Sequence, residues 1–185
     1  RRVKQFIFAS SEWVYGDVTD GEVQNEETAI DANGIGSEYV LTKLAGERLL
    51  AMAYQRGFCP VTILRFGIVY GPRPRYWSAV EQLFHAVRTQ EAVEVKGSLR
   101  SARRFIHVSD VAQGILASLG HPGFELFNLS GNRLISLRDI IETSSELLTR
   151  TPRIIERNPS AVSIRNPDNS KAHRLLGWQP LVDLK

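Results

Sequence analysis

Short apolar runs alternate with longer amphipathic segments along this chain. Val3 to Ser11 is a β-rich apolar run that ends in small hydroxyl side chains, which is typical of a buried parallel strand. Ser37 to Gln55 carries apolar residues at mixed spacings of three and four, between Gly36 and Gly57, and this pattern predicts a long helix. A second strand is expected at 61–66. Strand, helix and strand in this order predict a parallel sheet of the doubly wound kind.

The same alternation continues to the end of the chain. Residues 16–36 are polar, acidic and contain glycines, so we expect a surface loop. Residues 71–75 hold two prolines and cannot lie inside a helix or strand. The other expected elements are helices at 78–89, 108–119, 136–149 and 170–176, and strands at 92–95, 124–131 and 153–155. Ser109 or Asp110 is expected to cap the helix 108–119, Ser136 the helix 136–149, and Gly177 to end the last helix.

Composition narrows the class of protein. The 185 residues are enough for one core, or for one domain with a smaller companion. The sequence has neither an apolar run of the ~20 residues that a membrane span needs nor a signal-peptide pattern, so a cytoplasmic protein is expected. The net charge of +3 gives little support for nucleic-acid binding. A single cysteine and four scattered histidines argue against a disulfide framework and a zinc site.

Tyr39 and Lys43 are the first candidates for chemistry. A helix places side chains at i and i+4 on one face, so a phenol and an ammonium are neighbours here. An isolated phenol titrates near ~10, and a cation about 4 Å away favours the phenolate by roughly 4 kcal/mol at an effective dielectric of about 20. Such a pair can transfer protons near neutral pH. Taken alone, the pair has a simpler explanation, with the tyrosine packed and the lysine solvated.

Six blocks along the chain together resemble one protein family. They are similar, in the same order, to the extended short-chain dehydrogenase/reductase superfamily, and within it to the NAD-dependent epimerase/dehydratase group that acts on nucleotide sugars. The resemblance covers nearly the whole chain. The blocks are FIFASSEWVYGD at 6–17, SEYVLTKLAGE at 37–47, ILRFGIVYGPR at 63–73, RRFIHVSDVAQGI at 103–115, FNLSG at 127–131 and RNPDNSKAHRLLGWQP at 165–180.

The resemblance implies catalytic and cofactor-binding roles for five residues. Tyr39 matches the general acid/base, and Lys43 matches the lysine that activates it and holds the nicotinamide ribose. Ser11 matches the hydroxyl that hydrogen-bonds the reacting sugar oxygen, although a serine that caps a strand end is the simpler reading of that residue alone. Phe66 and Ile68 match positions that line the nicotinamide. The implied cofactor is NAD or NADP.

The resemblance also implies a substrate site. Arg103 matches the arginine that grips the substrate diphosphate, and Arg165 resembles a second arginine for the same nucleotide. Arg73 is a further candidate for this surface, and each arginine has the alternative of a solvated position. Glu12 stands where 4,6-dehydratases carry an acidic proton donor. Trp13 occupies the position of their second carboxylate, so dehydration is not specifically implied.

Three functions therefore stay open from the sequence. The first is a nucleotide-sugar epimerase/dehydratase that works through a transient keto intermediate. The second is a short-chain reductase or dehydrogenase of a non-sugar alcohol or carbonyl. It is suggested by Ile68, where many relatives carry Asn, and by Trp13, because together they make a less polar pocket. The third is a truncated, non-catalytic fragment, because the family's N-terminal GxxGxxG turn for the pyrophosphate has no counterpart here and the chain starts within a strand pattern.

The expected fold is α/β. It is the C-terminal part of a doubly wound, Rossmann-type parallel sheet with a smaller α/β substrate-binding region. Residues 1–71 and about 105–131 are assigned to the cofactor domain, and about 72–104 and 132–185 to the smaller region. The resemblance also implies a homodimer through the helix that carries Tyr39 and Lys43. Leu44 and Leu49 are apolar, outward candidates for this contact, although an ordinary core contact explains them as well. The substrate sugar, the stereochemical outcome and the choice between NAD and NADP stay undetermined.

Overall fold

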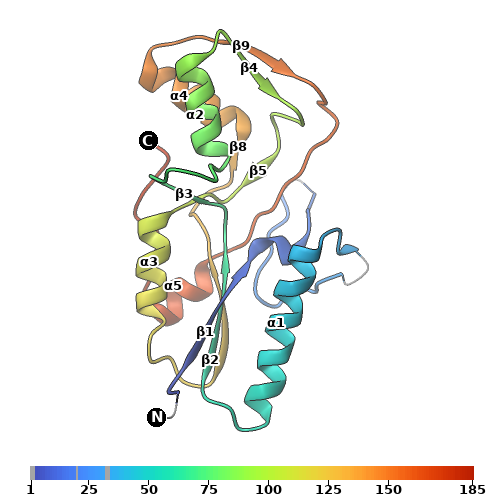
Figure 1. The fold of residues 1–185 in the computed structure, drawn as a ribbon, viewed down its shortest axis with the longest axis vertical. Helices are drawn as coiled ribbons and strands as arrows, with labels where there is room; N and C mark the ends of the chain where they lie inside the picture. Colours follow the sequence, from blue (N-terminus) through green and yellow to red (C-terminus); the bar gives the residue numbers. More distant parts are fainter. Residues whose placement is uncertain (1–2, 20, 32–33) are drawn as a thin grey trace.

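A three-stranded parallel sheet forms the lower half of the molecule (Figure 1). The computed structural model describes residues 3–19, 21–31 and 34–185. The strands β1 (Phe6–Ser11), β2 (Val61–Phe66) and β7 (Phe124–Leu129) pair in the order β1-β2-β7. The helix α1 (Glu38–Gln55) connects β1 to β2, so the predicted βαβ unit is confirmed. Arg1, Arg2 and three residues of the expected surface loop, at 20, 32 and 33, lie outside the described residues.

Helices cover both faces of this sheet. Figure 1 shows α1 on one side, and α3 (Val108–Ala117) with α5 (Ser170–Leu176) on the other. Gly46 allows α1 to approach β1 closely, because a Cβ atom there would lie 2.5 Å from Cζ of Phe8. On the opposite face, the apolar side chains of β2 and β7 form one buried cluster with Ala172 and Trp178. The parallel sheet is therefore buried between two helical layers, as its apolar strands require.

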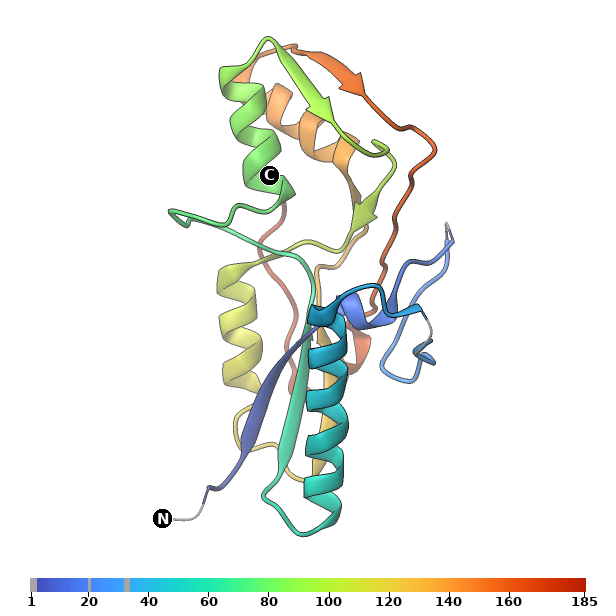
Figure 2. The same ribbon diagram turned by 45° about the vertical axis from the view of Figure 1, so that its right-hand side comes forward.

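The second region lies at the other end of the molecule (Figure 2). It contains α2 (Ala79–Thr89), α4 (Leu137–Leu148), and the parallel pair β4 (Ala92–Val95) and β9 (Arg153–Glu156). Its own core includes Leu83, Val93 and Ile140. Short strand pairs join the two regions: β3 (Val69–Tyr70) with β6 (Ile106–His107), and β5 (Ala102–Arg103) with β8 (Ile135–Ser136).

One segment assigned to the smaller region from the sequence packs against the parallel sheet instead. Although residues 132–185 are assigned from the sequence to the smaller region, α5 packs against the sheet at the opposite end. The division into a cofactor domain and a substrate region stays a prediction. Within the described residues, no helix has the length and apolar character needed to cross a membrane. A cytoplasmic location stays a prediction as well.

The helix ends follow their sequence signals with one exception. Ser136 caps α4 by accepting a hydrogen bond from the backbone N–H of Asp139, and Gly177 ends α5 with φ of 63°. The prediction for α3 was wrong, because His107 is its N-cap and accepts from the N–H of Ser109. Asp110 is buried, and its carboxylate instead accepts from the N–H of Val182, in the C-terminal tail.

Candidate active site

Ser11 and Phe66 lie side by side at the carboxyl ends of their strands. The register pairs Ser11 of β1 with Phe66 of β2, the edge where open α/β sheets place their ligands. Ser11 is buried, and its Oγ accepts a hydrogen bond from the N–H of Trp13 at 3.3 Å. This bond begins the 3-10 helix η1 (Glu12–Tyr15). Ser11 therefore caps η1 at the end of β1, and its role toward a reacting sugar oxygen stays a prediction.

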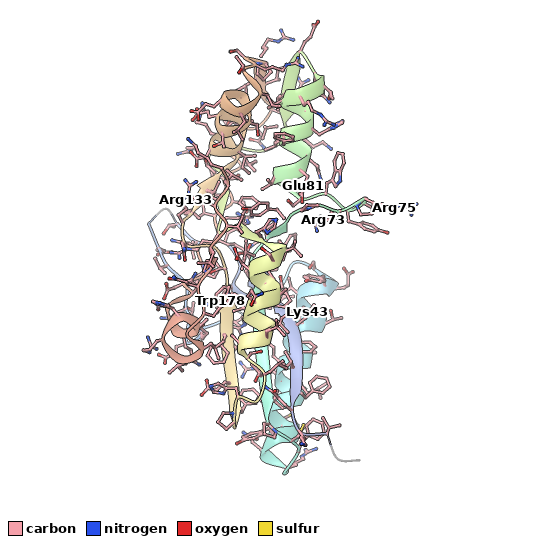
Figure 3. The ribbon with its side chains drawn as sticks, turned by 90° about the vertical axis from the view of Figure 1, so that its left-hand side faces the viewer. Lys43, Arg73, Arg75, Glu81, Arg133 and Trp178 are labelled. Atoms are coloured by element: carbon pink, nitrogen blue, oxygen red, sulfur yellow. The ribbon has the colours of Figure 1, made fainter. Side chains whose placement is uncertain are left out.

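Tyr39 and Lys43 are neighbours on the first turns of α1. Ser37 caps this helix by accepting from the N–H of Val40, which fixes where the first turn starts. The Nζ of Lys43 lies 5.5 Å from the centre of the Tyr39 ring and donates to the carbonyl of Ala9 in β1 at 2.9 Å. Lys43 reaches from α1 toward β1 (Figure 3). The predicted pair is thus present, with its ammonium tied to the sheet and the tyrosine half-exposed.

Trp13 connects this pair to a cluster of arginines. Its ring stands edge-on to the ring of Tyr39, with centroids 6.1 Å apart. The guanidinium of Arg165 lies over the Trp13 ring, 4.6 Å from its centre. From the sequence, Trp13 is a departure from the dehydratase pattern and part of a less polar pocket. The signal for its contact with Tyr39 is its place two residues after Ser11, the last residue of β1.

Arg103 and Arg165 come together, as the resemblance implied. Both side chains are largely buried, with 16% and 12% of their surfaces exposed. Arg103 donates to the carbonyl of Ser163 at 2.6 Å and to its hydroxyl at 2.5 Å. Asp17 faces both arginines, with its Oδ1 3.3 Å from Nε of Arg165 and 3.8 Å from Nη2 of Arg103. Two buried guanidinium groups side by side form a site suited to an anion.

Glu12 lies beneath these arginines and is completely buried. Its Oε1 is 3.7 Å from Nε of Arg103, too far for a hydrogen bond. Within the described part of the chain, neither carboxylate oxygen of Glu12 has a hydrogen-bond partner, and the same is true of Nε and Nη1 of Arg165. Burial raises the pKa of Glu12 to about 8, because desolvation outweighs the attraction of Arg103 and Arg165.

Two of the proposed site residues lie elsewhere. Arg73 donates to the carbonyl of Val69 at 2.7 Å and pairs with Glu81 at 3.2 Å, and the two side chains are neighbours in Figure 3. In the described residues, none of its hydrogen bonds or ion pairs reaches Arg103 or Arg165, so the structure does not bring it into their cluster. Ile68 packs against the core of the second region.

A second buried charge cluster, which was not predicted from the sequence, lies one residue before Ser11 and Phe66 on their strands. The register aligns Ser10, Arg65 and Asn128 across the three strands. Arg65 forms a two-pronged ion pair with Glu47 of α1, at 2.9 and 2.6 Å, and Ser10 donates to the same carboxylate at 2.5 Å. Tyr15 stacks over Arg65 and donates to Asn128 at 2.8 Å. Polar residues at equivalent positions in three apolar runs were its sequence signal.

Two cavities border residues that the sequence predicts for the site. One of about 440 Å³ is bordered by Trp13, Arg165 and the start of α1 at Ser37. Another of about 340 Å³ lies between α2 and α4, beside Trp77 and Arg73, and its lining is mostly apolar. The first adjoins both the tyrosine helix and the arginine cluster, so the chemistry favours it as part of the site.

Comparisons with known proteins agree with this geometry. The sequence model described as "NAD dependent epimerase/dehydratase family" matches residues 1–130. An uncharacterized UDP-glucose epimerase of Bacillus subtilis is 33% identical over 99% of this chain and 58% of its own length. The structure of UDP-glucuronic acid 4-epimerase from Bacillus cereus, in complex with UDP-glucuronic acid and NAD, is similar with a TM-score of 0.84. It is 27% identical, over 100% of this chain and 59% of that one.

A third comparison is with MoeE5 in complex with UDP-glucuronic acid and NAD. Its TM-score is 0.84 and its identity 29%, over 98% of this chain and 61% of MoeE5. The chain thus spans somewhat more than half the length of these similar proteins. The likeness confirms the Rossmann-type α/β fold that the sequence predicts.

Proposed function

The chain belongs to the NAD-dependent epimerase/dehydratase family, and we propose that it carries the acid/base and substrate-binding part of an NAD(P)-dependent nucleotide-sugar enzyme. The reaction class is epimerisation or dehydration through a transient keto intermediate. One observation carries the proposal: a continuous series of contacts leads from Lys43 through Tyr39 and Trp13 to the buried Arg165. A proton-transfer pair and an anion site are thereby held at a fixed separation.

The residues present fit the nicotinamide half of such a cofactor. The ammonium of Lys43 has three donors, of which one is used by the carbonyl of Ala9, so donors are left for ribose hydroxyls. Phe66 stands at the strand end beside Ser11 and offers an apolar surface for a ring. Tyr39, Lys43 and Phe66 would hold this part. When bound, the cofactor would accept and return a hydride.

The protein's own groups would move and orient the proton. Tyr39 is half-exposed at the start of α1, so its phenol oxygen is free to approach a substrate hydroxyl. Lys43 would stabilise negative charge on that oxygen by Coulomb attraction. Ser11, fixed at the end of β1, would hydrogen-bond the reacting sugar oxygen. The reacting carbon would therefore be placed between α1 and the ends of β1 and β2.

The arginine cluster favours a nucleotide-sugar substrate over a non-sugar alcohol. Arg165 has buried nitrogen atoms without hydrogen-bond partners, in the part of the chain that the structure describes. A diphosphate would supply oxygens for these donors, whereas a neutral alcohol or carbonyl compound would leave them unsatisfied. Relatives and similar structures that carry UDP-glucose or UDP-glucuronic acid in their names support this reading.

A homodimer through α1 is part of the proposal. Leu41, Leu49 and Met52 are exposed on this helix, with 55%, 65% and 46% of their surfaces open to solvent. Leu44 is partly buried against the small core cluster of Val14, Tyr15 and Val40, so the alternative of an ordinary core contact holds for this residue. A second copy of α1 would cover the exposed apolar side chains.

Replacement of Tyr39 by Phe tests the proposed function. The change Tyr39→Phe removes the proton-transferring oxygen and keeps the ring against Trp13, so turnover should fall by roughly 10²- to 10⁴-fold. The assay follows UDP-glucose and UDP-glucuronic acid with NAD and with NADP, using the protein that contains this chain. The matched control is Tyr54→Phe, because Tyr54 is on the same helix and packs against Phe124, at the far end of β7.

The two variants give a clear decision. The proposal requires that Tyr54→Phe turns over at the unchanged rate and that both variants have the unfolding midpoint of the parent. Near-normal turnover in the Tyr39→Phe variant would refute the acid/base assignment. A loss of turnover in both variants to the same extent would show that the helix, and not the phenol of Tyr39, determines activity.

A further inference from the structure

The completely buried Glu12 is difficult to explain as a structural residue. A structural carboxylate in the interior is normally paired and hydrogen-bonded. Glu12 accepts no hydrogen bond from any described residue, and Arg103 approaches its Oε1 only to 3.7 Å. The neighbouring Arg165 also has two nitrogen atoms without hydrogen-bond partners, Nε and Nη1, although its Nε lies 3.3 Å from Oδ1 of Asp17 as an ion pair. The cluster therefore lacks hydrogen bonds on both sides, at the carboxyl group of Glu12 and at the guanidinium of Arg165.

The charges around Glu12 define its two states. In the described residues, the charged groups that act on it are Arg103 from β5, Arg165 from the segment after β9, and Asp17 from the loop after η1. With Glu12 ionised, two positive and two negative charges balance. With Glu12 protonated, the cluster has one positive charge in excess. An anion bound to the arginines would therefore be disfavoured by the first state and favoured by the second.

We propose that Glu12 is the proton-accepting counter-charge of Arg103 and Arg165, and that a diphosphate ligand binds to these arginines together with one proton. The proton comes from solvent and ends on the Glu12 carboxylate, so charge is conserved and no other bond changes. Glu12 is a positioning residue, because it acts through the arginines. The inference rests on the proposed function, and it adds that substrate affinity depends on pH.

The burial of Glu12 gives the direction in which substrate affinity changes with pH. Burial already raises the pKa of Glu12 to about 8 in the free protein, and a bound anion raises it further. Below that pH the carboxyl group is mostly protonated, so binding needs little extra proton. Above it, each pH unit should weaken diphosphate binding by up to about tenfold, the limit for uptake of one proton.

Calorimetric titration with UDP-glucose between pH 7 and pH 9.5 tests the proposal. Each titration is run in two buffers of different ionisation enthalpy, which measures the proton taken up per ligand bound. The parent protein should take up a growing fraction of one proton toward pH 9.5. In Glu12→Gln, a neutral amide replaces the carboxyl group, so uptake should vanish and affinity should become nearly constant over this range.

Asp17→Asn is the matched control. It removes a negative charge that faces the same two arginines and leaves Glu12 free to titrate. This variant should bind UDP-glucose more tightly than the parent at every pH and should still take up a proton, with the uptake starting at lower pH because Asp17 no longer raises the pKa of Glu12. The measurement on the parent protein needs no variant, so the test stands even where Glu12→Gln folds poorly.

The outcomes separate the inference from the proposed function. UDP-glucose binding without proton uptake, or with equal uptake in the parent and in Glu12→Gln, would overturn the role of Glu12 and leave the nucleotide-sugar site in place. If neither UDP-glucose nor inorganic pyrophosphate binds at any pH, both the inference and the anion site are wrong. Uptake that disappears in Glu12→Gln and persists in Asp17→Asn supports the proposal.

Discussion

Two glutamates are buried against arginines in this protein, and their surroundings differ. Glu47 on α1 has both carboxylate oxygens bonded to Arg65, and Ser10 donates a third hydrogen bond. Glu12 is completely buried, but neither of its carboxylate oxygens has a hydrogen-bond partner among the described residues. In the first cluster both carboxylate oxygens are bonded, and Nη1 of Arg65 is the one atom of this pair that lacks a hydrogen-bond partner among the described residues. In the second, two nitrogen atoms of Arg165 and both oxygens of Glu12 lack hydrogen bonds, so this cluster is suited to bind an anion.

The difference separates structural charge from functional charge. The pair of Glu47 and Arg65 joins α1 to β2, and α1 carries the proposed acid/base pair of Tyr39 and Lys43, so this closed cluster holds that helix in place. The open cluster of Glu12, Arg103 and Arg165 gives up hydrogen bonds that a closed arrangement would have. Changes in the closed cluster should therefore alter stability, and changes in the open cluster should alter binding and pH dependence.

The largest expected effect follows from breaking the closed pair. Glu47→Gln keeps the shape of the side chain but leaves the buried guanidinium of Arg65 without its counter-charge. Loss of one partner of a buried ion pair typically costs about 3–5 kcal/mol of folding free energy. Urea unfolding followed by circular dichroism measures this loss. The same variant should also lose turnover, because α1 is less firmly attached to the sheet.

An exposed pair with similar geometry is the control for that experiment. Arg157 and Glu94 form a two-pronged contact at 2.9 and 3.1 Å on the surface. Glu94→Gln should change the free energy of unfolding far less than Glu47→Gln, because water screens the exposed pair. Equal effects of the two variants would contradict the idea that burial makes the closed cluster structural.

Much of the fold could be predicted from the sequence, because it depends on local patterns. The strand at 61–66 and the helix at 170–176 agree with the prediction residue for residue, since their apolar periods and terminal glycine or proline signals are strong. The short strands β3, β5, β6 and β8 were missed. Two-residue strands have no period, and they form only where distant segments meet.

The residues of the candidate site could be predicted from the sequence, but the hydrogen bonds and ion pairs of those residues could not. The resemblance placed Tyr39 beside Lys43 and Arg103 beside Arg165, and the structure brings both pairs together. Whether Glu12 is bonded or unpaired depends on the packing of β5 and of the segment that carries Arg165, far away in sequence. The same applies to Arg73, whose partner Glu81 lies on the next helix.

The contribution of Glu12 to the free energy of unfolding should change with pH in the opposite direction from that of an ordinary ion-paired carboxylate. The pKa of Glu12 rises from 4.5 to about 8 on folding, so the unfolded chain loses this proton first as pH increases. The contribution of Glu12 is complete below pH 4.5 and is lost as pH rises toward 8. Glu12→Gln cannot lose a proton, so its advantage over the parent should grow by at most about 3 kcal/mol from pH 5 to pH 7.

Denaturant unfolding of parent and Glu12→Gln at several pH values checks this sign. The difference in free energy of unfolding between the two proteins should increase steadily with pH. Asp17→Asn is again the comparison, because Glu12 can still lose its proton in this variant, so its free energy of unfolding should fall with pH as that of the parent does. A Glu12→Gln variant that is less stable than the parent at pH 7 would show that Glu12 is ionised and favourably paired.

A smaller effect is expected from the edge of the closed cluster. Tyr15→Phe removes the hydroxyl that donates to Oδ1 of the buried Asn128, while the ring can still stack over Arg65. The unpaired amide oxygen should reduce the free energy of unfolding by about 1–2 kcal/mol. UDP-glucose affinity should not change, since this hydroxyl donates to Asn128 of β7 and not to the arginine cluster. Thermal unfolding and calorimetric titration of the same sample test both statements.

The smallest change in stability is expected for Ser163, at the edge of the open cluster. Its hydroxyl accepts from Arg103 and donates to Asp17, on a partly exposed surface. Ser163→Ala should lower the free energy of unfolding by about 0.5–1 kcal/mol, because water can replace both bonds. It should weaken UDP-glucose binding by roughly threefold to tenfold, since Arg103 loses one of the contacts that orient it.

Tyr15→Phe and Ser163→Ala can therefore be compared directly, because the first should alter mainly the free energy of unfolding and the second mainly the affinity for UDP-glucose. If Tyr15→Phe weakened binding and Ser163→Ala did not, the distinction between closed and open clusters would be wrong.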